Sequence, residues 1–310
     1  HSYIQFNGFK IRGYFGAVGA SGERGVAFDT DSVSTTRSNF VVGNCEITLM
    51  RSMDRDWIIE VRRSFSTITN NWLTDSYGGG FIIGGSQALV QYNTISNITG
   101  TAGYVNTCTN CDIGFNNFLD VRGTHAQGVS IYGNDSANWC VDVDFHHNKV
   151  LNFGALLTHQ WSTNIYVFNN LFDAQESSGQ INHWTGVKGT WYVNNTIVGN
   201  TNNNILSIGG SSSGLHHWVI NNIIDGGGIQ KSTGTNAVSH HNLYLSFAST
   251  WSQGTNDFNE GDTYSTNLAA IFMDPTARDW RLKEGSEAID TGTNAATLFW
   301  AGDGVTDDLL

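Results

Sequence analysis

The sequence predicts an all-β fold, a solenoid in which short parallel strands wind into one long coil. Three observations lead to this prediction: a composition suited to strands and tight turns, a short phrase around asparagine that recurs along most of the chain, and a second recurring phrase led by glycine. Each is typical of strands and turns rather than of helices.

The composition of the 310-residue chain favours strands joined by tight turns. Hydrophobic residues make up 39%, including 10 Trp and 17 Phe, which is enough for a sizeable core. Charged residues make up only 14%, and the chain contains 36 Gly but a single Pro. Globular domains usually carry roughly 25% charged residues, many of them on helix surfaces. We therefore expect an all-β domain with many turns.

A phrase of alternating apolar residues that ends in asparagine recurs ten times. Its asparagines are Asn7, Asn44, Asn71, Asn93, Asn117, Asn148, Asn170, Asn195, Asn222 and Asn242. Their separations run from 20 to 37 residues and several lie near 22, which indicates a coil of fixed length with loops of variable length. Asparagine tolerates the left-handed conformation of a sharp bend, and stacked amides can bond along a column. We predict about ten coils with an asparagine ladder at one corner.

Between the asparagines lies the second phrase, in which glycine precedes alternating apolar residues. It occurs at Gly25, Gly80, Gly128, Gly154 and Gly228. Each coil then holds three short strands: one after the glycine, one before the asparagine and one after it. A single coil cannot bury its apolar residues alone, so neighbouring coils stack around a continuous core. A β-propeller would repeat every 40–45 residues or so, and a leucine-rich repeat would show helices.

With these phrases the chain resembles the pectate-lyase-like superfamily of right-handed parallel β-helix proteins, over roughly residues 4–244. In that resemblance the asparagine corner corresponds to the short second turn, and the glycine-led strand to the strand called PB1. Residues 272–293 look like the segment that ends many secreted bacterial β-helix proteins. We expect one domain, with coils over residues 1–245, a C-terminal segment over residues 246–310 that packs on or caps the solenoid, and both ends cut.

The resemblance implies that an active site would lie along the outer face of PB1. Aligning the strands on their glycines places Glu60, Arg62 and Tyr132 on this face, with Arg63 and His159 nearby. Cleavage of a uronic-acid polysaccharide by β-elimination needs a cation for the carboxylate, a base for the C5 proton and an acid for the leaving oxygen. These residue types match those roles.

Residues of the adjoining loops and one exposed aromatic complete the expected site. Tyr77, Arg122 and His125 lie in loops beside the strands, and Trp184 offers an indole that a sugar ring can stack on. The expected catalytic residues are Arg62, Tyr132, His125, His159 and Glu60. The expected substrate-binding residues are Arg63, Arg122, Tyr77 and Trp184.

The same alignment also places an apolar stripe on the PB1 face. Ile58, Ile82, Val105 and Leu156 are expected to point outward next to one another. Such a stripe is typical of a covered surface, so we expect a long loop, a further domain or a second copy in a homo-oligomer over it.

Cysteines and carboxylates leave several alternatives open. One disulfide among Cys108, Cys111 and Cys140 is expected, against buried free thiols, and no second Cys pair completes a zinc site. Asp142 and Asp144 alternate with apolar residues on one strand, where they can bind Ca²⁺, act in hydrolysis or simply aid solubility. No cofactor is otherwise indicated, and Ca²⁺ stays an open alternative.

Net charge and hydropathy exclude two classes of binding partner. A net charge of −12 argues against nucleic acid, and no apolar run reaches the roughly 18 residues of a membrane span. We expect a protein of the extracellular space or of a cell or virion surface that acts on a polysaccharide. A polysaccharide lyase for an acidic glycan is the leading hypothesis. A non-catalytic adhesin, tailspike-like fibre or surface structural protein is the alternative, and a glycoside hydrolase comes third.

Overall fold

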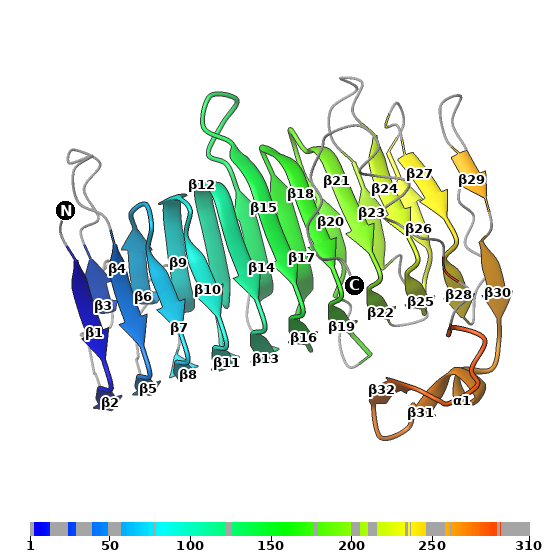
Figure 1. Ribbon diagram of the computed structural model, residues 1–310, viewed down its shortest axis with the longest axis horizontal. Helices are drawn as coiled ribbons and strands as arrows, with labels where there is room; N and C mark the ends of the chain where they lie inside the picture. The colour runs from blue at the N-terminus through cyan, green and yellow to red at the C-terminus, as the bar shows by residue number, and fades with distance from the viewer. Residues whose placement is uncertain are drawn as a thin grey trace.

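A computed structural model shows parallel strands that follow one another in coils, from the blue N-terminal end to the orange C-terminal end in Figure 1. The structure describes residues 3–12, 24–28, 39–48, 57–76, 78–121, 126–175, 179–199, 205–209, 216–232, 235, 237–245, 258–260, 262–289 and 292. The coils between the first and the last contribute a segment to each of three faces, named PB1, PB2 and PB3 in their order within one coil, and the first and last described coils contribute to PB2 and PB3.

The three faces consist of the following strands. PB1 contains β3 (Arg24–Phe28), β6 (Trp57–Arg62), β9 (Gly79–Ser86), the first half of β12 (Gly103–Gly114), β14 (Gln127–Tyr132), β17 (Ala155–Gln160), β20 (Ile181–His183), β23 (Leu206–Ile208) and β26 (Ile229–Lys231). PB2 contains β1 (Ile4–Asn7), β4 (Phe40–Gly43), β7 (Thr67–Thr69), β10 (Leu89–Gln91), the second half of β12, β15 (Cys140–His146), β18 (Ser162–Phe168), β21 (Lys188–Val193), β24 (His217–Ile220), β27 (Ala237–His240) and β29 (Phe258–Glu260). PB3 contains β2 (Lys10–Arg12), β5 (Glu46–Thr48), β8 (Trp72–Ser76), β11 (Thr94–Ile98), β13 (Asn117–Val121), β16 (Lys149–Leu151), β19 (Leu171–Asp173), β22 (Thr196–Val198), β25 (Ile223–Asp225), β28 (Leu243–Leu245) and β30 (Thr263–Ser265).

Parallel pairing in constant register turns each strand position into a row along the solenoid axis, with one residue per coil about 4.8 Å apart. In PB1, Val61 pairs with Ile83 and Ile83 pairs with Val105, and all three are fully buried. Rings from different faces meet inside the coil, because Phe145 of PB2 packs against Phe118 and Phe172 of PB3 with centroids 6.3 and 6.1 Å away. One continuous core therefore fills the interior.

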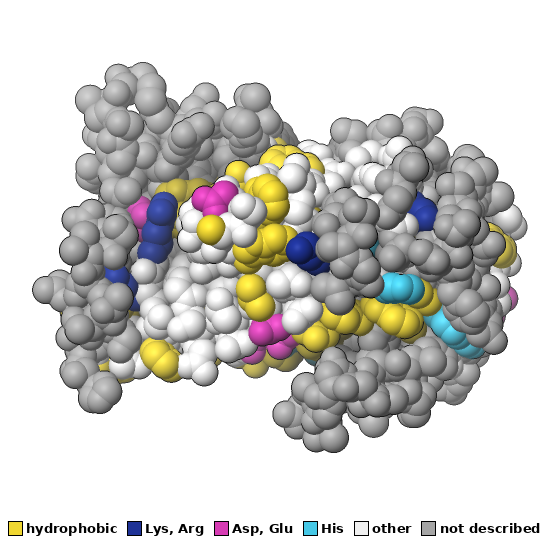
Figure 2. Space-filling model, turned by 90° about the horizontal axis from the view of Figure 1, so that it is seen from above, with side chains coloured by type: hydrophobic (Ala, Val, Ile, Leu, Met, Phe, Trp, Pro, Cys, Tyr) yellow, Lys and Arg dark blue, Asp and Glu magenta, His cyan; other side chains and the backbone are white. Residues whose placement is uncertain are grey.

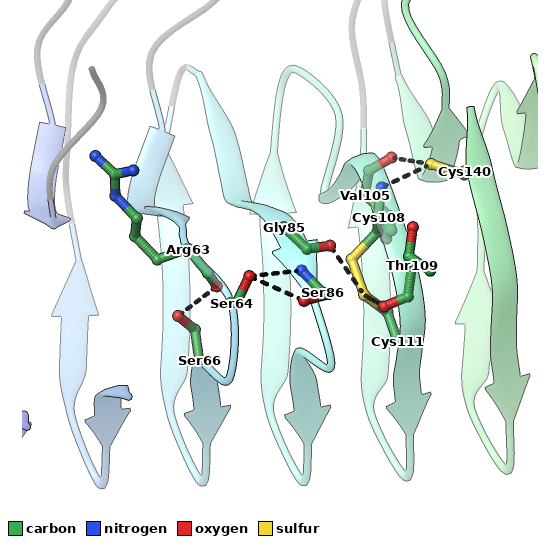
Figure 3. The surroundings of a disulfide bond; sticks show 10 residues. All are labelled: Arg63, Ser64, Ser66, Gly85, Ser86, Val105, Cys108, Thr109, Cys111 and Cys140. Atoms are coloured by element: carbon green, nitrogen blue, oxygen red, sulfur yellow. Dashed lines mark hydrogen bonds between the residues drawn. A yellow bond between two sulfur atoms is a disulfide. The ribbon is translucent and has the colours of Figure 1, made fainter. Parts of the chain in front are cut away.

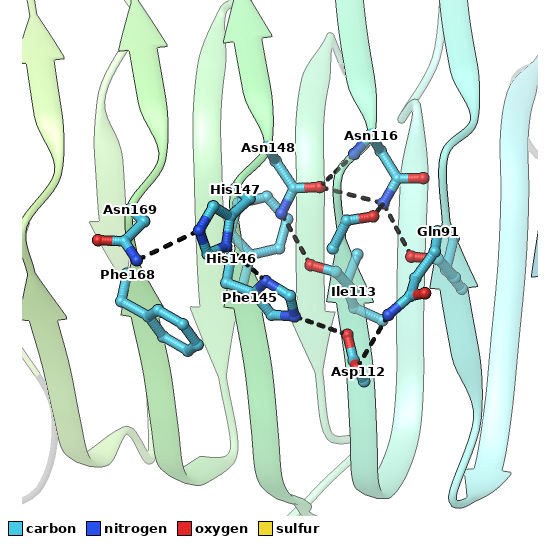
Figure 4. Close-up of polar contacts among 12 residues, drawn as sticks. Gln91, Asp112, Ile113, Asn116, Phe145, His146, His147, Asn148, Phe168 and Asn169 are labelled. Carbon is cyan, nitrogen blue, oxygen red and sulfur yellow. Dashed lines mark hydrogen bonds and ion pairs between the residues drawn. The ribbon is translucent and has the colours of Figure 1, made fainter. Parts of the chain in front are cut away.

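A column of buried asparagines runs along the corner between PB2 and PB3. Its members are Asn71, Asn93, Asn116, Asn148, Asn170, Asn195, Asn222 and Asn242. Each Nδ2 donates to the Oδ1 of the next asparagine at 2.9–3.2 Å, as Figure 4 shows for Asn116 and Asn148. The last amide donates to the carboxylate of Asp262, at 3.1 Å. Because every amide both donates and accepts, the column satisfies its buried polar atoms.

Three asparagines of the recurring phrase stand outside this column. Asn117 is exposed at the start of β13, and its neighbour Asn116 takes the buried position. Asn44 lies one residue before the column position in a left-handed conformation, with φ 52°. Cys45 occupies the column position there, and its thiol donates to the carbonyl of Gly43 at 3.1 Å. Asn7 is likewise exposed on the first described coil. Where two asparagines are adjacent, as at Asn116 and Asn117, the position of the left-handed bend in the backbone determines which one is buried.

The expected apolar stripe on PB1 is wrong for three of its four residues. Ile58, Val105 and Leu156 belong to the interior core, and only Ile82 occupies an outward position, where it is nevertheless buried. The corner between PB3 and PB1 turns two consecutive residues inward, since Ile58 and Ile59 are both buried in the core. Strict alternation therefore fails at that corner. No stripe is left to support the expected contact between copies of the chain.

The C-terminal part folds back onto PB3 (Figure 1). It contains α1 (Leu268–Ile271) and a hairpin of β31 (Phe272–Asp274) and β32 (Asp279–Leu282). Its Phe272 and Trp280 pack with Leu243 and other side chains of the later PB3 strands. The buried carboxylate of Asp173 accepts hydrogen bonds from Arg278 and from the Trp280 indole, each at 2.8 Å.

Cys108 and Cys111 form a disulfide within β12, as Figure 3 shows. Cys140 of the next coil is a buried free thiol beside it, and its Sγ accepts a hydrogen bond from the backbone N–H of Cys108 at 3.3 Å. Burial raises the pKa of Cys140 to about 11, so the thiol is protonated at neutral pH. Of the pairings left open by the sequence, the structure thus selects the one within the Cys108–Cys111 motif.

The asparagine column predicts a sharp difference between two adjacent residues. Replacing Asn116 by Ala removes an internal link: the backbone N–H of Asn93 loses its acceptor, and the Asn93 amide and the Asn148 oxygen each lose one of their hydrogen bonds. Urea unfolding should show a loss of about 1–3 kcal/mol. Asn117→Ala, its exposed neighbour, should change stability by less than about 0.5 kcal/mol. Equal stabilities of the two variants would contradict a column that runs through Asn116.

Candidate functional site

The outer face of PB1 carries two rows of outward side chains. The first row contains Glu60, Ile82, Tyr104, Ser130, Thr158, Asn182, Ser207 and Gln230. The second row contains Arg62, Gly84, Asn106, Tyr132 and Gln160. Apart from Ile82 and Gly84 these side chains are polar. Glu60, Ser130, Thr158 and Asn106 are buried, whereas Arg62, Tyr104, Tyr132 and Gln160 are at least partly exposed. These exposed groups, two of them aromatic, are suited to a sugar chain.

Arg62 and Glu60 form an ion pair at the N-terminal end of the two rows. The Nε of Arg62 lies 2.9 Å from Oε1 of Glu60, whose side chain is fully buried. The Arg62 side chain is 41% exposed, so part of its guanidinium group stays open to a ligand. Partial burial lowers the pKa of Arg62, while its charge interaction with Tyr104 acts in the opposite direction. Glu60 is therefore a partner that holds the cation, and Arg62 is the accessible member of the pair.

Two tyrosines continue the site from Arg62 towards the middle of PB1. The rings of Tyr104 and Tyr132 have centroids 5.5 Å apart, and Trp57 lies 5.5 Å from Tyr104 on the other side. The Tyr132 hydroxyl accepts a hydrogen bond from Nε2 of Gln160 at 3.0 Å, which leaves its own proton available for donation. Tyr104 and Tyr132 thus lie in contact on neighbouring coils. Arg62 lies two coils before Tyr104, with Gly84 and Ile82 on the coil between them, and interacts with Tyr104 through its charge.

Sequence reasoning missed Tyr104 because it placed Val105 on the outer face. In the structure Gly103, Tyr104 and Val105 pair with Phe81, Ile82 and Ile83. Gly103 therefore takes an interior position, where a Cβ would lie 2.6 Å from the ring of Phe81. The large ring of one coil fills the space above the glycine of the next. That size complementarity was the available signal, and it shifts the outward positions of β12 by one residue.

Polar side chains between these residues hold the face together. The hydroxyls of Ser130 and Thr158 lie 2.6 Å apart on neighbouring coils. The amide of Asn106 donates to the carbonyl of Tyr132 at 3.2 Å and to the side chain of Asn134 at 2.9 Å. The backbone under Tyr132 is therefore fixed from the preceding coil.

Trp184 extends the second row at its C-terminal end. His183, the residue before it, pairs with His159, and the backbone N–H of Trp184 donates to the carbonyl of His159 at 2.8 Å. Trp184 therefore lies beside Gln160, the residue after His159. Its side chain is 47% exposed. In the nearby turns, Trp139 packs edge-on against Trp161 and Lys188 lies 4.6 Å over the Trp139 ring. Viewed from above, the described surface in Figure 2 shows hydrophobic side chains with few charged ones between them.

Other expected site residues take different places. His159 lies in the interior row that continues from Ile131, because alternation in β17 turns it away from the outer face. Arg63, expected to bind substrate, is buried just beyond the end of β6, and Figure 3 shows its side chain directed away from the disulfide. Tyr77, Arg122 and His125 lie outside the described residues.

His159 is part of a histidine cluster inside the solenoid. Its ring contacts His183 at 5.1 Å, His183 contacts His217 at 4.9 Å, and all three side chains are buried. His183 is hydrogen-bonded through both ring nitrogens, to the Tyr192 hydroxyl at 2.8 Å and to the carbonyl of Gly209 at 3.1 Å. Burial lowers the pKa of His159 to about 3 and that of His217 to about 4. These imidazoles are therefore neutral at pH 7 and pack as part of the core.

A second polar network lies on PB2. Asp112 and Asp144 pair in register on adjacent coils, and Nε2 of His146 lies 2.9 Å from Asp112 (Figure 4). Desolvation and the carboxylate of Asp112 raise the pKa of Asp144 to about 6. The sequence paired Asp144 with Asp142 instead, but Asp142 has a left-handed backbone and accepts a hydrogen bond from Asn164. This network lies on a different face from Arg62 and the tyrosines.

Two further searches concern metals and membranes. Within the described ranges no group of three or more His, Cys, Asp or Glu side chains is arranged to hold a metal ion. In the same part of the chain, no helix is long and apolar enough to cross a membrane.

Comparisons with known proteins place the chain by its fold. A family model described as "Right handed beta helix region" matches residues 15–172. Among solved structures, XylC in complex with xylose matches at 11% identity and a TM-score of 0.46, over 75% of this chain and 51% of that one. The Dettilon tailspike protein (gp208) matches at 10% identity and a TM-score of 0.40, over 73% of this chain and 61% of that one. The A-module of the mannuronan C-5 epimerase AlgE4 from Azotobacter vinelandii matches at 10% identity and a TM-score of 0.39, over 74% of this chain and 64% of that one.

The chain spans about half to two thirds of the length of these three proteins. No curated protein matches the sequence.

The interior histidines predict a loss of stability in mild acid. The pKa values of His159 and His217 in the folded state lie below the usual histidine value of 6.5, so the unfolded chain binds more protons as the pH falls below that value. The free energy of unfolding should therefore fall as pH drops from about 6.5 towards about 4. His159→Leu should reduce this pH dependence in urea titrations at pH 8, 6, 5 and 4. Ile131→Val, in the same row, should lower stability equally at every pH. A parent whose stability is flat over this range would contradict neutral interior histidines.

Proposed function

Because this chain belongs to the family of right-handed β-helix proteins, as the two recurring phrases predicted, we propose that its outer PB1 face binds an acidic polysaccharide and cleaves it by β-elimination. Family membership gives the fold, whereas the function rests on the residues of the face. The observation that carries the proposal is that one face presents the Tyr104–Tyr132 pair together with Arg62, whose charge interacts with Tyr104. The protein would act outside the cell or at a cell or virion surface.

Arg62 supplies the charge that the reaction requires. The proton at C5 of a uronate becomes acidic only when the negative charge of the neighbouring carboxylate is neutralised. The half-exposed guanidinium of Arg62 is available for that carboxylate, and buried Glu60 fixes its position. The stabilisation grows as the carboxylate becomes enolate-like, so it favours the transition state over the bound substrate.

The two tyrosines divide the proton transfers. Tyr104, which interacts with the charge of Arg62, is assigned as the base that takes the C5 proton in its phenolate form. The electron pair of the broken C5–H bond forms the C4–C5 double bond and expels the glycosidic oxygen from C4. Tyr132 is assigned as the acid that protonates this oxygen, because its hydroxyl already accepts from Gln160 and keeps its proton free to donate.

Elimination is supported over hydrolysis by the shortage of carboxylates. A glycoside hydrolase uses two carboxyl groups on either side of the bond that it cleaves. In the two described rows of PB1, Glu60 is the single carboxylate, and it is fully buried against Arg62. Asp112 and Asp144 lie on PB2 and do not reach this face. Trp184, two coils beyond Tyr132, is assigned to stack on a sugar of the same chain.

A screen against acidic polysaccharides tests the proposal. The full chain is incubated with polygalacturonate, alginate and hyaluronan, and absorbance of unsaturated products is read together with reducing ends. We expect both to rise on at least one substrate. Tyr104→Phe and Tyr132→Phe should each lower kcat by about 10²-fold or more, because each removes one hydroxyl and keeps the ring packing. Arg62→Gln should lower kcat more than it weakens binding, with the fold checked by circular dichroism since Glu60 loses its partner.

Asp142→Asn on PB2 is the matched control and should leave the rate unchanged. Reducing ends without unsaturated product would replace the lyase with a hydrolase. Binding without either product would favour a non-catalytic surface protein. Loss of activity in Asp142→Asn alone would move the site to PB2.

A further inference from the structure

A groove of about 620 Å³ lies on the first described coils, beside the corner between PB2 and PB3. Its lining includes Asn44, Glu46, Asn70, Trp72, Tyr92 and Thr94. We call this feature the corner groove. None of its residues belongs to the PB1 rows, so it lies around the coil from Arg62 and the tyrosines.

Two exposed aromatic side chains border the corner groove. Trp72 is 55% exposed and Tyr92 is 54% exposed. Tyr92 stacks on Phe115 of the next coil, with centroids 5.1 Å apart and planes at 11°, and Phe115 stacks in turn on His147. Since this stack extends towards the C-terminal coils, the other face of the Tyr92 ring is turned towards the coil of Asn70. One flat aromatic face therefore looks into the groove.

Tyr92 occupies a position at which most coils carry a smaller residue. The residue before each buried asparagine has a left-handed backbone, and on five coils it is asparagine: Asn70, Asn169, Asn194 and Asn221, with Asn44 before Cys45. Phe115, His147 and His241 share the left-handed conformation at this position, so it belongs to the repeating corner, and Tyr92 differs from Asn70 in the size of its side chain. The short Asn44 and Asn70 beside tall Tyr92 and Trp72 also create the hollow.

The walls of the groove offer hydrogen bonds at its base. The amides of Asn44 and Asn70 donate to Asn7 at 2.7 Å and to Thr69 at 3.2 Å, which leaves their Oδ1 atoms as acceptors. The lining also contains Trp72, with its indole N–H, and Thr94, with its hydroxyl. Aromatic faces with a few fixed polar groups are the arrangement that recognises a sugar ring, which is apolar on its faces and polar at its edge.

The charge of the lining selects among sugars. Its one ionisable side chain with a full charge is Glu46, and no Lys or Arg lines the groove. Hydrogen bonds from Lys10 and Arg12 hold the pKa of Glu46 below its usual value, so the carboxylate stays ionised. This carboxylate is paired with two cations, so it presents no unpaired charge to a ligand, and the lining offers no cation of its own for a uronate.

We propose that the corner groove binds an uncharged pyranose unit of a polysaccharide, stacked against Tyr92 and Trp72 and hydrogen-bonded by Asn44, Asn70 and Thr94. This inference goes beyond the proposed function of PB1 and does not require it. Two sites on opposite sides of one solenoid can engage two glycan chains at once, or two parts of one chain, which raises the overall affinity for a polymer.

The test borrows residues from neighbouring coils so that the fold is kept. Tyr92→Asn introduces the residue that Asn70 provides at the same corner position, and Trp72→Thr introduces the residue that Thr94 provides in the same PB3 row. Titration calorimetry of the full chain with cellohexaose, xylohexaose and mannohexaose should detect binding of at least one. Each substitution should raise its Kd about tenfold, and the double variant should show no measurable binding. Tyr264→Ala, which removes an exposed aromatic elsewhere on PB3, should bind like the parent.

Absence of binding to all three neutral hexasaccharides would overturn the proposal, and so would a double variant that binds as the parent does. Binding confined to a galacturonate hexamer, and lost in the double variant, would overturn the assignment to an uncharged sugar. Tyr132→Phe separates the two sites: it should leave calorimetric binding of the neutral hexasaccharide intact whether or not the chain is a lyase.

Discussion

Stacking of parallel strands in constant register is the constraint on which the rest of this molecule depends. A residue in one coil has its neighbours fixed about 4.8 Å away in the coils before and after it. The buried asparagine column makes that register specific, because each amide finds its acceptor only when successive coils are aligned. Once the register is set, the interior rows pack as a continuous core, and the outer rows become long tracks of side chains.

These tracks explain how residues far apart in the sequence form one surface. Arg62, Tyr104 and Tyr132 come from three different strands, yet they share one face because the coils are in register, with Tyr104 and Tyr132 on neighbouring coils and Arg62 two coils before Tyr104. The scaffold behind them is rigid, and individual outer positions contribute little to the core. Outer rows can therefore change their chemistry while the inner rows remain constrained. The interior tolerates polar residues only when they stay neutral or are hydrogen-bonded, as the cluster around His183 shows.

Most of the fold could be predicted from the sequence, because the two recurring phrases report directly on the register. The family match confirms the right-handed β-helix. Residues were assigned to the wrong side of a strand where the alternation of inward and outward side chains is interrupted at a corner between two faces. Ile58 and Ile59 both turn inward, which no alternation predicts. Gly103 lacks a side chain and takes its interior place only because the Phe81 ring fills the space. Whether Asn116 or Asn117 takes the buried position in the asparagine column depends on where the backbone bends.

The candidate site was harder to predict than the fold. Glu60, Arg62, Tyr132 and Trp184 were correctly placed outward, since they lie in the regular parts of their strands. Tyr104 was missed with the shift in β12, and His159 required knowledge of the row that it continues. Pairing between coils, which decides who lies beside whom, depends on loop lengths and on side-chain sizes in other coils. The sequence of a single strand contains no information about the loop lengths or the side-chain sizes of other coils.

The C-terminal hairpin changes how such a molecule comes apart. In a simple solenoid each coil contacts only its neighbours, so the end coils can fray one at a time. Here Arg278 and Trp280 reach back to Asp173, more than a hundred residues earlier, while Phe272 packs with side chains from PB3. The later coils lie between these two attachments. Opening the last coil therefore also requires the C-terminal hairpin to lose its contacts with Asp173 and PB3. These contacts join several coils into one cooperative unit and slow unfolding from that end.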